Sequence, residues 1–246
     1  MACEPSNTPT QFQMKIRIPN SRRWLISISA TLFVGSAFLA GCGGGGSSAG
    51  SITPPPPSYG GGLKPGDVAI TVAHHVSLTT NYGTIVVGLD ATHAPLSTAN
   101  FLAYVSAGFY NNSLFHRVVP GFVIQGGGYT DQSGTYSAKP TTSTVALESR
   151  NGLSNTQYTI AMARASDPNS ASSQFYFNLV NNASSLDYPS SDGAGYAVFG
   201  TVALTDAASI ATVNAIAAVA NGTNSQTGLA NWPTRDVVIS SAVKID

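Results

Sequence analysis

The side chains best able to do chemistry lie in one run, residues 115–127, which reads FHRVVPGFVIQGG. Its valines and isoleucine make it strand-like, and Pro120-Gly121 should kink it. An arginine between aromatic residues is costly to bury, so Arg117 should face a polar cleft. Phe122 and Gln125 lie three residues apart, just beyond the kink. The run therefore predicts a polar cleft beside Arg117.

Other residue types that often do chemistry are poorly placed for it. His116 is next to Arg117, but the alternation of a strand turns it to the opposite face, so we interpret it as a structural core histidine. The remaining histidines lack any ligand constellation and are expected at the surface: His74, His75 and His93. The chain has only two cysteines, which excludes a disulfide scaffold and a cysteine-based zinc site. We therefore expect no metal.

The composition narrows the class of protein further. The 246 residues carry 11 Lys+Arg and 11 Asp+Glu, so the formal net charge is zero. Charged residues make up 9% of the chain, whereas about 25% is typical of soluble domains. Phosphate binding needs a basic stripe, so nucleic acid is excluded as a partner. A hydrophobic content of 43% is enough to build a core.

Residues 1–41 have the features of a bacterial lipoprotein signal peptide. A basic stretch is followed by 17 mostly apolar residues, Trp24 to Ala40, fewer than the ~20 that span a bilayer. Leu39-Ala40-Gly41-Cys42 then resembles the lipobox, in which the cysteine is lipidated and becomes the mature N-terminus. The alternative is an ordinary cleaved signal with an incidental cysteine. Translation could start at Met1 or at Met14.

Cleavage before Cys42 would leave a mature chain with a net charge of −3, because four basic residues and one acid are removed. Residues 42–66 are rich in Gly, Ser and Pro and are expected to form a tether. Gly43 replaces the Asp that is associated with inner-membrane retention in many Gram-negative bacteria. The resemblance therefore implies the periplasmic face of the cell envelope, with the outer membrane favoured in such an organism.

Residues 67–246 are expected to form one domain. Residues 68–76 and 84–89 should pair as a hairpin around a turn at Asn81-Tyr82-Gly83. A helix should end near Ser106, capped by Ser97 or Thr98, and a second should start at Thr205-Asp206. Further strands are predicted at 113–125, 158–163, 173–179, 196–202 and 237–243. Many strands with two helices predict a closed antiparallel barrel whose ends the helices cover.

Three sequence blocks in this domain resemble the cyclophilin family of peptidyl-prolyl cis-trans isomerases. Residues 115–127 match the family signature almost letter for letter. The second block is TIAMAR at 159–164 followed by SSQFYFN at 172–178, and the third is Leu186-Asp187 followed by GYAVFG at 195–200. The resemblance covers residues 67–246 and is greatest with the periplasmic bacterial branch. It implies a closed eight-stranded antiparallel β-barrel capped by two α-helices.

The resemblance also implies a reaction, the rotation of X–Pro peptide bonds during protein folding, with no cofactor. Proline-containing polypeptides would be the partners of a monomeric enzyme. Arg117 would hydrogen-bond to the prolyl nitrogen, and Gln125 would hold the carbonyl side and orient Arg117. Phe122, Val123, Tyr176, Leu186 and Tyr196 would line the proline pocket. Ala163, Arg164 and Gln174 would bind the substrate backbone.

The chain departs from the family at three positions. Val123 replaces a usual Met, Tyr176 replaces a common Phe, and Ser185 stands where an aromatic residue precedes Leu186. The Tyr176 hydroxyl needs a hydrogen-bond partner. These changes bear on pocket affinity, so two functions stay open: an active isomerase, or a catalytically weak module that binds proline-containing segments. Arg164 could also be a solvated arginine at the cleft rim.

Overall fold

The computed structural model describes residues 63–246. The predicted signal peptide (1–41), the predicted lipidation site Cys42 and most of the predicted tether lie outside these residues. The last four residues assigned to the tether are described, and they lie against the domain. Leu63 forms an isolated parallel bridge with Asn151, and the Gly66 amide donates to the Gly152 carbonyl at 2.8 Å.

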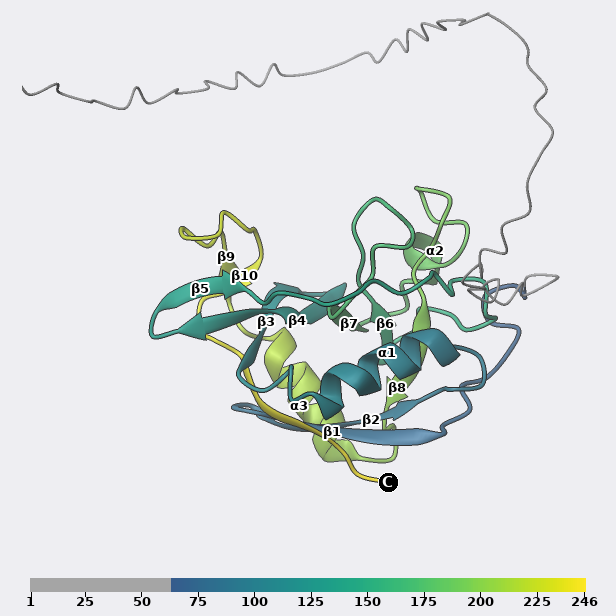
Figure 1. Ribbon diagram of the computed structural model, residues 1–246, viewed down its shortest axis with the longest axis horizontal. Coiled ribbons are helices and arrows are strands. Elements are labelled where there is room, and N and C mark those ends of the chain that lie inside the picture. The colour runs from purple at the N-terminus through teal and green to yellow at the C-terminus, as the bar shows by residue number, and fades with distance from the viewer. Residues whose placement is uncertain (1–62) are drawn as a thin grey trace, which may run out of the picture. The chain divides into compact units, whose positions relative to one another are not determined.

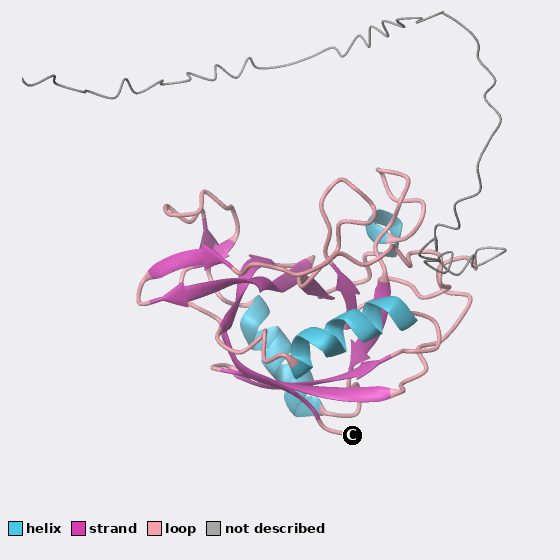
Figure 2. Ribbon diagram, viewed as in Figure 1, coloured by secondary structure: helices cyan, strands magenta, loops and turns pink. Residues whose placement is uncertain are grey.

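Eight strands close into an antiparallel barrel, seen as the magenta arrows of Figure 2. Their order around the barrel is β3, β11, β1, β2, β8, β6, β7 and β4, and β4 pairs with β3 to close it. The strands are β1 (His74–Thr80), β2 (Gly83–Leu89), β3 (Ser113–Val119), β4 (Val123–Gln132), β6 (Thr159–Met162), β7 (Phe175–Asn178), β8 (Val198–Val202) and β11 (Val238–Lys244). The predicted fold class is therefore confirmed.

Two main helices, α1 (Pro95–Ser106) and α3 (Ala207–Ala217), pack on the barrel (Figure 1). Phe101 of α1 and Val213 and Ile216 of α3 are buried in the main core cluster. The Phe101 ring lies 5.4 Å from those of Phe175 and Phe199. None of the helices in the described part of the chain is long and apolar enough to cross a bilayer.

The predicted cap of α1 is wrong. Ala94 precedes the helix without a side-chain cap, and Ser97 and Thr98 are buried in its first turn. The buried carboxylate of Glu148 accepts instead from the amides of Leu96 (3.0 Å) and Ser97 (2.7 Å) and from the Ser97 hydroxyl (2.7 Å). A negative charge is stabilising at a helix N-terminus. The predicted start of α3 is confirmed, because Asp206 accepts from the Ala208 amide at 3.1 Å.

The first strand begins later than predicted, at His74 and not at residue 68. Residues before it are held by other groups, since the Val68 amide donates to the Gly152 carbonyl and the Thr71 amide donates to buried Asp90. The hairpin turn is where expected, with Thr80 opposite Gly83. Four short elements were not predicted: β5 (Thr135–Ala138), α2 (Ala183–Leu186), β9 (Asn221–Gly222) and β10 (Trp232–Pro233).

Candidate functional site

A cavity of about 190 Å³ gathers nine of the ten predicted catalytic and substrate-binding residues. They come from β3, β4, β7, α2 and the segments that precede β4, follow β6 and precede β8. The strands β6, β7, β4 and β3 are successive neighbours in the sheet, which brings most of these residues together. The floor is apolar and contains the buried side chains of Val123, Tyr176 and Leu186. The lining residues are Arg117, Phe122, Val123, Gln125, Ala163, Arg164, Tyr176, Leu186 and Tyr196.

Arg117 is the cation at the edge of this cavity. It lies on β3, directly opposite Gln125 on β4. Within residues 63–246, no hydrogen bond or ion pair engages its guanidinium. Partial burial lowers the pKa of Arg117, and the nearby Tyr196 acts in the opposite direction. An arginine still carries its charge at neutral pH. The group is therefore a fixed cation with free donors, held at the mouth of an apolar pocket.

Gln125 was predicted to orient Arg117, but among residues 63–246 its side chain hydrogen-bonds to Gln174 and not to Arg117. The Nε2 of Gln125 donates to Oε1 of Gln174 at 2.8 Å. Gln174 packs over Gly128 of β4, where an added Cβ would lie 2.5 Å from the Gln174 side chain. Gln174 is the tenth predicted residue, and it lines two adjoining cavities that also include Gln125. The hydrogen-bonded side chains of Gln125 and Gln174 therefore lie between the apolar cavity and the two adjoining cavities.

Ala163 and Arg164 follow β6 along the rim of the cavity. The Ala163 amide donates to the Gln174 carbonyl at 3.0 Å, which extends the β6–β7 ladder past its last strand pair. The Arg164 side chain is only 1% exposed, so it is not the solvated arginine that was considered as an alternative. Its main chain remains beside the cavity, where the predicted backbone contact with substrate would have to be made.

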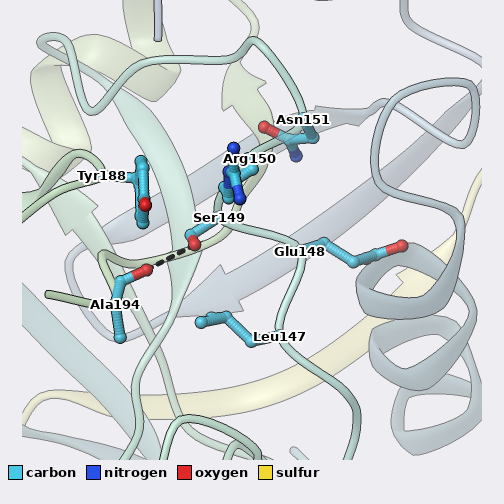
Figure 3. A pocket seen from close by; sticks show the side chains of 7 residues that line it. All are labelled: Leu147, Glu148, Ser149, Arg150, Asn151, Tyr188 and Ala194. Atoms are coloured by element: carbon cyan, nitrogen blue, oxygen red, sulfur yellow. Dashed lines mark hydrogen bonds between the residues drawn. The ribbon is translucent and has the colours of Figure 1, made fainter. Parts of the chain in front are cut away.

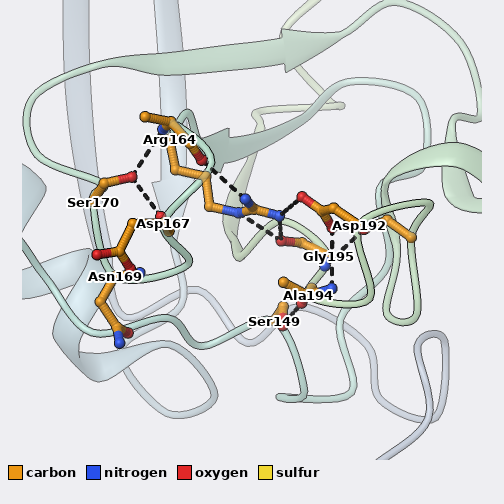
Figure 4. A network of polar contacts seen from close by, with 10 residues as sticks. Ser149, Arg164, Asp167, Asn169, Ser170, Asp192, Ala194 and Gly195 are labelled. Carbon is orange, nitrogen blue, oxygen red and sulfur yellow. Dashed lines mark hydrogen bonds and ion pairs between the residues drawn. The ribbon is translucent and has the colours of Figure 1, made fainter. Parts of the chain in front are cut away.

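The Arg164 guanidinium is fully engaged by the loop that precedes β8 (Figure 4). Its Nε and Nη2 both donate to the Gly195 carbonyl, at 3.0 and 2.9 Å. Nη2 also pairs with Asp192 at 2.5 Å, and the guanidinium lies 4.4 Å from the Tyr196 ring centroid. Hydrogen bonds from Ser190, Ala194 and Arg164 hold the pKa of Asp192 well below its usual value. Arg164 thus holds a wall of the pocket in place.

Of the three residues that depart from the family pattern, two line the cavity and one does not. Val123 and Tyr176 line the cavity, and the Tyr176 hydroxyl has its partner, donating to Asn155 Oδ1 at 2.8 Å. Ser185 is exposed on α2 and does not line the cavity. Tyr188 does not fill the space of the missing ring, since it lines a different cavity. Neither Ser185 nor Tyr188 therefore supplies an aromatic wall to the cavity.

His116 does not line the apolar pocket, but it lines an adjoining cavity together with Arg117 and Gln125. The prediction that alternation turns it to the face opposite Arg117 is wrong, because the β3–β4 ladder is irregular between Phe115 and Arg117. His116 is buried and its ring lies 4.8 Å from Tyr129 and 6.0 Å from Trp232. Burial lowers the pKa of His116 to about 4, so the ring is neutral at physiological pH. His74 and His75 lie near Asp246, and His93 Nδ1 lies 2.8 Å from the carboxylate of Asp90. Among residues 63–246, no cluster of potential metal ligands forms.

A second cavity, of about 300 Å³, contains none of the predicted site residues (Figure 3). Arg150 stacks over the Tyr188 ring here, at 4.6 Å. Glu148 points away from this cavity toward α1, where its carboxylate is bound. Ser149 donates to the Ala194 carbonyl at 2.5 Å. Those contacts are structural, so the Arg117 cavity is the candidate site.

The sequence did not single out the buried amides behind the pocket. Asn155 and Asn178 are completely buried, and Asn182 is nearly so. Their side chains bond to one another and to residues that line the cavity. Asparagine is usually an exposed residue, and no spacing in the sequence marks these three as a group. Their role is visible only when the strands and α2 are assembled.

Comparison with known proteins places this arrangement in one family. The family model for cyclophilin-type peptidyl-prolyl cis-trans isomerases matches residues 75–244. The chain is 49% identical to peptidyl-prolyl cis-trans isomerase A of Dickeya dadantii over 134 residues, which are 54% of this chain and 68% of the relative. It is 41% identical to isomerase B of Escherichia coli over 169 residues, covering 68% and 96%.

The fold also resembles a solved structure. A cyclophilin-type peptidyl-prolyl cis-trans isomerase of Cryptosporidium parvum, crystallised in the presence of the dipeptide Ala-Pro, aligns with a TM-score of 0.54 and 26% identity. The alignment covers 70% of this chain and 99% of that one. The sequence and the fold therefore point to the same family.

Proposed function

The chain belongs to the cyclophilin-type peptidyl-prolyl cis-trans isomerase family and is such an isomerase, and we propose that Arg117 is its principal catalytic residue and the bacterial cell envelope its place of action. Rotation of a peptide bond faces a barrier of about 18–20 kcal/mol, which amide resonance creates. X–Pro is a suitable substrate because its cis form lies only about 0.5–1 kcal/mol above trans. The protein must bind the twisted amide better than either planar form.

The observation that carries this mechanism is the free guanidinium of Arg117 beside an apolar pocket. A proline ring fits against the half-buried Phe122 and the buried Val123, Tyr176 and Leu186. In that position the prolyl nitrogen faces Arg117. As the amide twists, the nitrogen loses resonance and gains a basic lone pair, to which Arg117 donates. A fixed cation of this kind stabilises the transition state more than the ground state.

Gln125, Ala163, Arg164 and Gln174 hold the rest of the substrate. Gln125 keeps its carbonyl oxygen and one amide hydrogen for the substrate while its other hydrogen bonds to Gln174. The main chain at Ala163 and Arg164 runs along the rim, extended beside β7. A substrate strand laid there would keep the residue before proline in one orientation.

The proposed location depends on residues outside the described part of the chain. The Leu39-Ala40-Gly41-Cys42 sequence supports lipidation of Cys42, and the Gly/Ser/Pro-rich residues after it support a spacer. A single acyl chain binds a membrane reversibly, whereas the two or three chains of a bacterial lipoprotein anchor it stably. The isomerase domain would then work on envelope proteins as they fold near the membrane.

The test combines fractionation with an isomerase assay. Membranes from cells that make the wild type should carry X–Pro isomerase activity, and membranes with the Arg117→Ala variant should lose it. Cys42→Ser should release the protein to the soluble fraction or leave an unprocessed precursor, while the domain stays active. Unchanged fractionation and unchanged mass of Cys42→Ser would contradict the anchor. Activity that survives Arg117→Ala would contradict the mechanism.

A further inference from the structure

One amide, Asn155, lies directly behind the proline pocket without lining it. The residue is 0% exposed. Its Oδ1 accepts from the Tyr176 hydroxyl at 2.8 Å and from Asn178 Nδ2 at 3.1 Å. Its Nδ2 donates to Asp187 Oδ1 at 2.8 Å and to the Tyr196 carbonyl at 3.3 Å. An asparagine side chain offers two acceptor sites and two donors, so every one is used.

The main chain of Asn155 adds two further bonds to the same segment. Its amide donates to Asp187 Oδ1 at 2.8 Å, and its carbonyl accepts from the Asn182 amide at 2.9 Å. Asp187 is also bound by the Ser154 hydroxyl at 2.5 Å. Asp187 directly follows Leu186. Asn155 therefore ties both ends of α2 to the barrel and, with them, the Leu186 side of the pocket.

A second amide extends the network to Phe122. Asn182 Nδ2 donates to the Phe122 carbonyl and to Asn178 Oδ1, both at 2.8 Å. The connected walls, Phe122, Tyr176, Leu186 and Tyr196, come from four separate segments of the chain. Apolar contacts between such walls have no preferred direction. Hydrogen bonds do have one, so the amides decide how the walls face one another.

We propose that Asn155 is the positioning residue of the proline pocket, through its bonds to Tyr176, Tyr196 and Asp187. This inference rests on the proposed function, in which that pocket receives the proline ring. None of the hydrogen bonds of Asn155 reaches Arg117 or Gln125. Substitution of Asn155 should therefore weaken the binding of the cis, trans and twisted forms of the X–Pro bond by similar amounts. Uniform loss of binding raises KM and leaves kcat unchanged.

The experiment measures kcat and KM for a short X–Pro peptide by NMR exchange spectroscopy. Asn155→Ala should raise KM about tenfold and change kcat by less than about twofold. Ser209→Ala is the matched control, because Ser209 is also 0% exposed. It bonds to Val86 and Asp206, neither of which lines the pocket. The control should lower the melting temperature with KM unchanged.

A smaller variant decides the question if Asn155→Ala does not fold. Tyr176→Phe removes one bond to Asn155 and leaves the ring that faces the pocket, so KM should rise about two- to fourfold at constant kcat. The double variant, Asn155→Ala with Tyr176→Phe, lacks both the amide and the hydroxyl, so no buried hydroxyl is left without a partner. Its effect on KM, expressed as a free energy, should therefore be less than the sum of the two single effects. An unchanged KM in Tyr176→Phe, or a fall in kcat alone in Asn155→Ala, would overturn the proposal.

These outcomes are distinct from failure of the proposed function. If the pocket is not where proline binds, Arg117→Ala retains activity and wild-type protein shows no chemical-shift changes at Tyr176 and Tyr196 on peptide addition. If only the positioning role is wrong, both of those results appear as expected while the Asn155 and Tyr176 variants keep the wild-type KM.

Discussion

Arg117 of β3 and Gln125 of β4 are direct partners across the antiparallel ladder, yet Gln125 donates to Gln174 at 2.8 Å and not to Arg117. Partners in such a ladder lie about 4.5–5.5 Å apart at their Cα atoms, with side chains on the same face. Both side chains therefore point into the cleft. Among residues 63–246, the Gln125 oxygen accepts no hydrogen bond from Arg117, so the guanidinium keeps its donors for the substrate.

Arg117→Ala should remove most of the isomerase activity and leave the fold intact. A preorganised donor in a sheltered site contributes roughly 2.7–4 kcal/mol to the transition state, which corresponds to about 100- to 1000-fold in rate. A protease-coupled assay of an X–Pro peptide measures the loss, and circular dichroism checks the fold. Arg150→Ala is the control, since Arg150 is an exposed arginine at the other cavity. Near-wild-type turnover of Arg117→Ala would refute its assigned role.

His116 should make the stability of the protein depend on pH without affecting catalysis. Burial lowers the pKa of His116 to about 4, against about 6.5 in an unfolded chain. The unfolded state therefore takes up the proton first as the pH falls. The stabilisation is complete above about pH 6.5 and is lost progressively down to about pH 4, a change of about 3 kcal/mol.

Urea unfolding of wild type and His116→Gln at several pH values measures this effect. Glutamine does not titrate, so the difference in unfolding free energy between the two proteins should shrink by about 3 kcal/mol from pH 7 to pH 4. Activity per folded molecule should stay the same in both. A difference that is constant over this pH range would show that the buried histidine does not titrate as described.

Glu148 should stabilise the protein from the N-terminus of α1. Its carboxylate accepts three hydrogen bonds from Leu96 and Ser97 and is 4% exposed. Glu148→Ala leaves those donors without partners and should cost about 2–4 kcal/mol of unfolding free energy. Glu148→Gln keeps one acceptor oxygen and should cost less. Equal losses in the two variants, measured by thermal unfolding, would argue against the capping role.

Ser185 should make the protein a weak binder of cyclosporin-type cyclic peptides. It is exposed one residue before Leu186, which lines the pocket, at the position where the resemblance to the family implies an aromatic residue such as tryptophan. The missing ring, of about 150–250 Å², and its hydrogen bond of about 1 kcal/mol together suggest a deficit of roughly 2–4 kcal/mol. That corresponds to about 30- to 1000-fold in affinity.

Titration of such a peptide against wild type and Ser185→Trp tests this prediction. The substitution should tighten binding at least about tenfold, while turnover of a small X–Pro peptide changes little. Nanomolar binding by the wild type, or no gain in Ser185→Trp, would show that position 185 does not supply the missing contact.

The sequence by itself determined the features that depend on neighbours along the chain. Residues 113–125, predicted as one kinked strand, instead form two antiparallel strands, and the short turn of this β3–β4 hairpin brings Arg117, Phe122 and Gln125 to one place. Asp206 caps the helix that starts directly after it. Each of these follows from local geometry, in which the partner is at most a few residues away.

Only the tertiary structure decided which group each polar side chain bonds. Glu148 caps a helix 51–52 residues before it, Gln125 reaches Gln174, and the Arg164 guanidinium is held by Gly195 and Asp192. Asn155 meets Tyr176 of β7 and Asp187, which follows α2, only because the fold brings these two segments to the loop before β6. A buried donor or acceptor must find a partner, but the partner is whichever segment the fold brings within about 3 Å. That choice depends on how distant segments pack, which local sequence patterns do not encode.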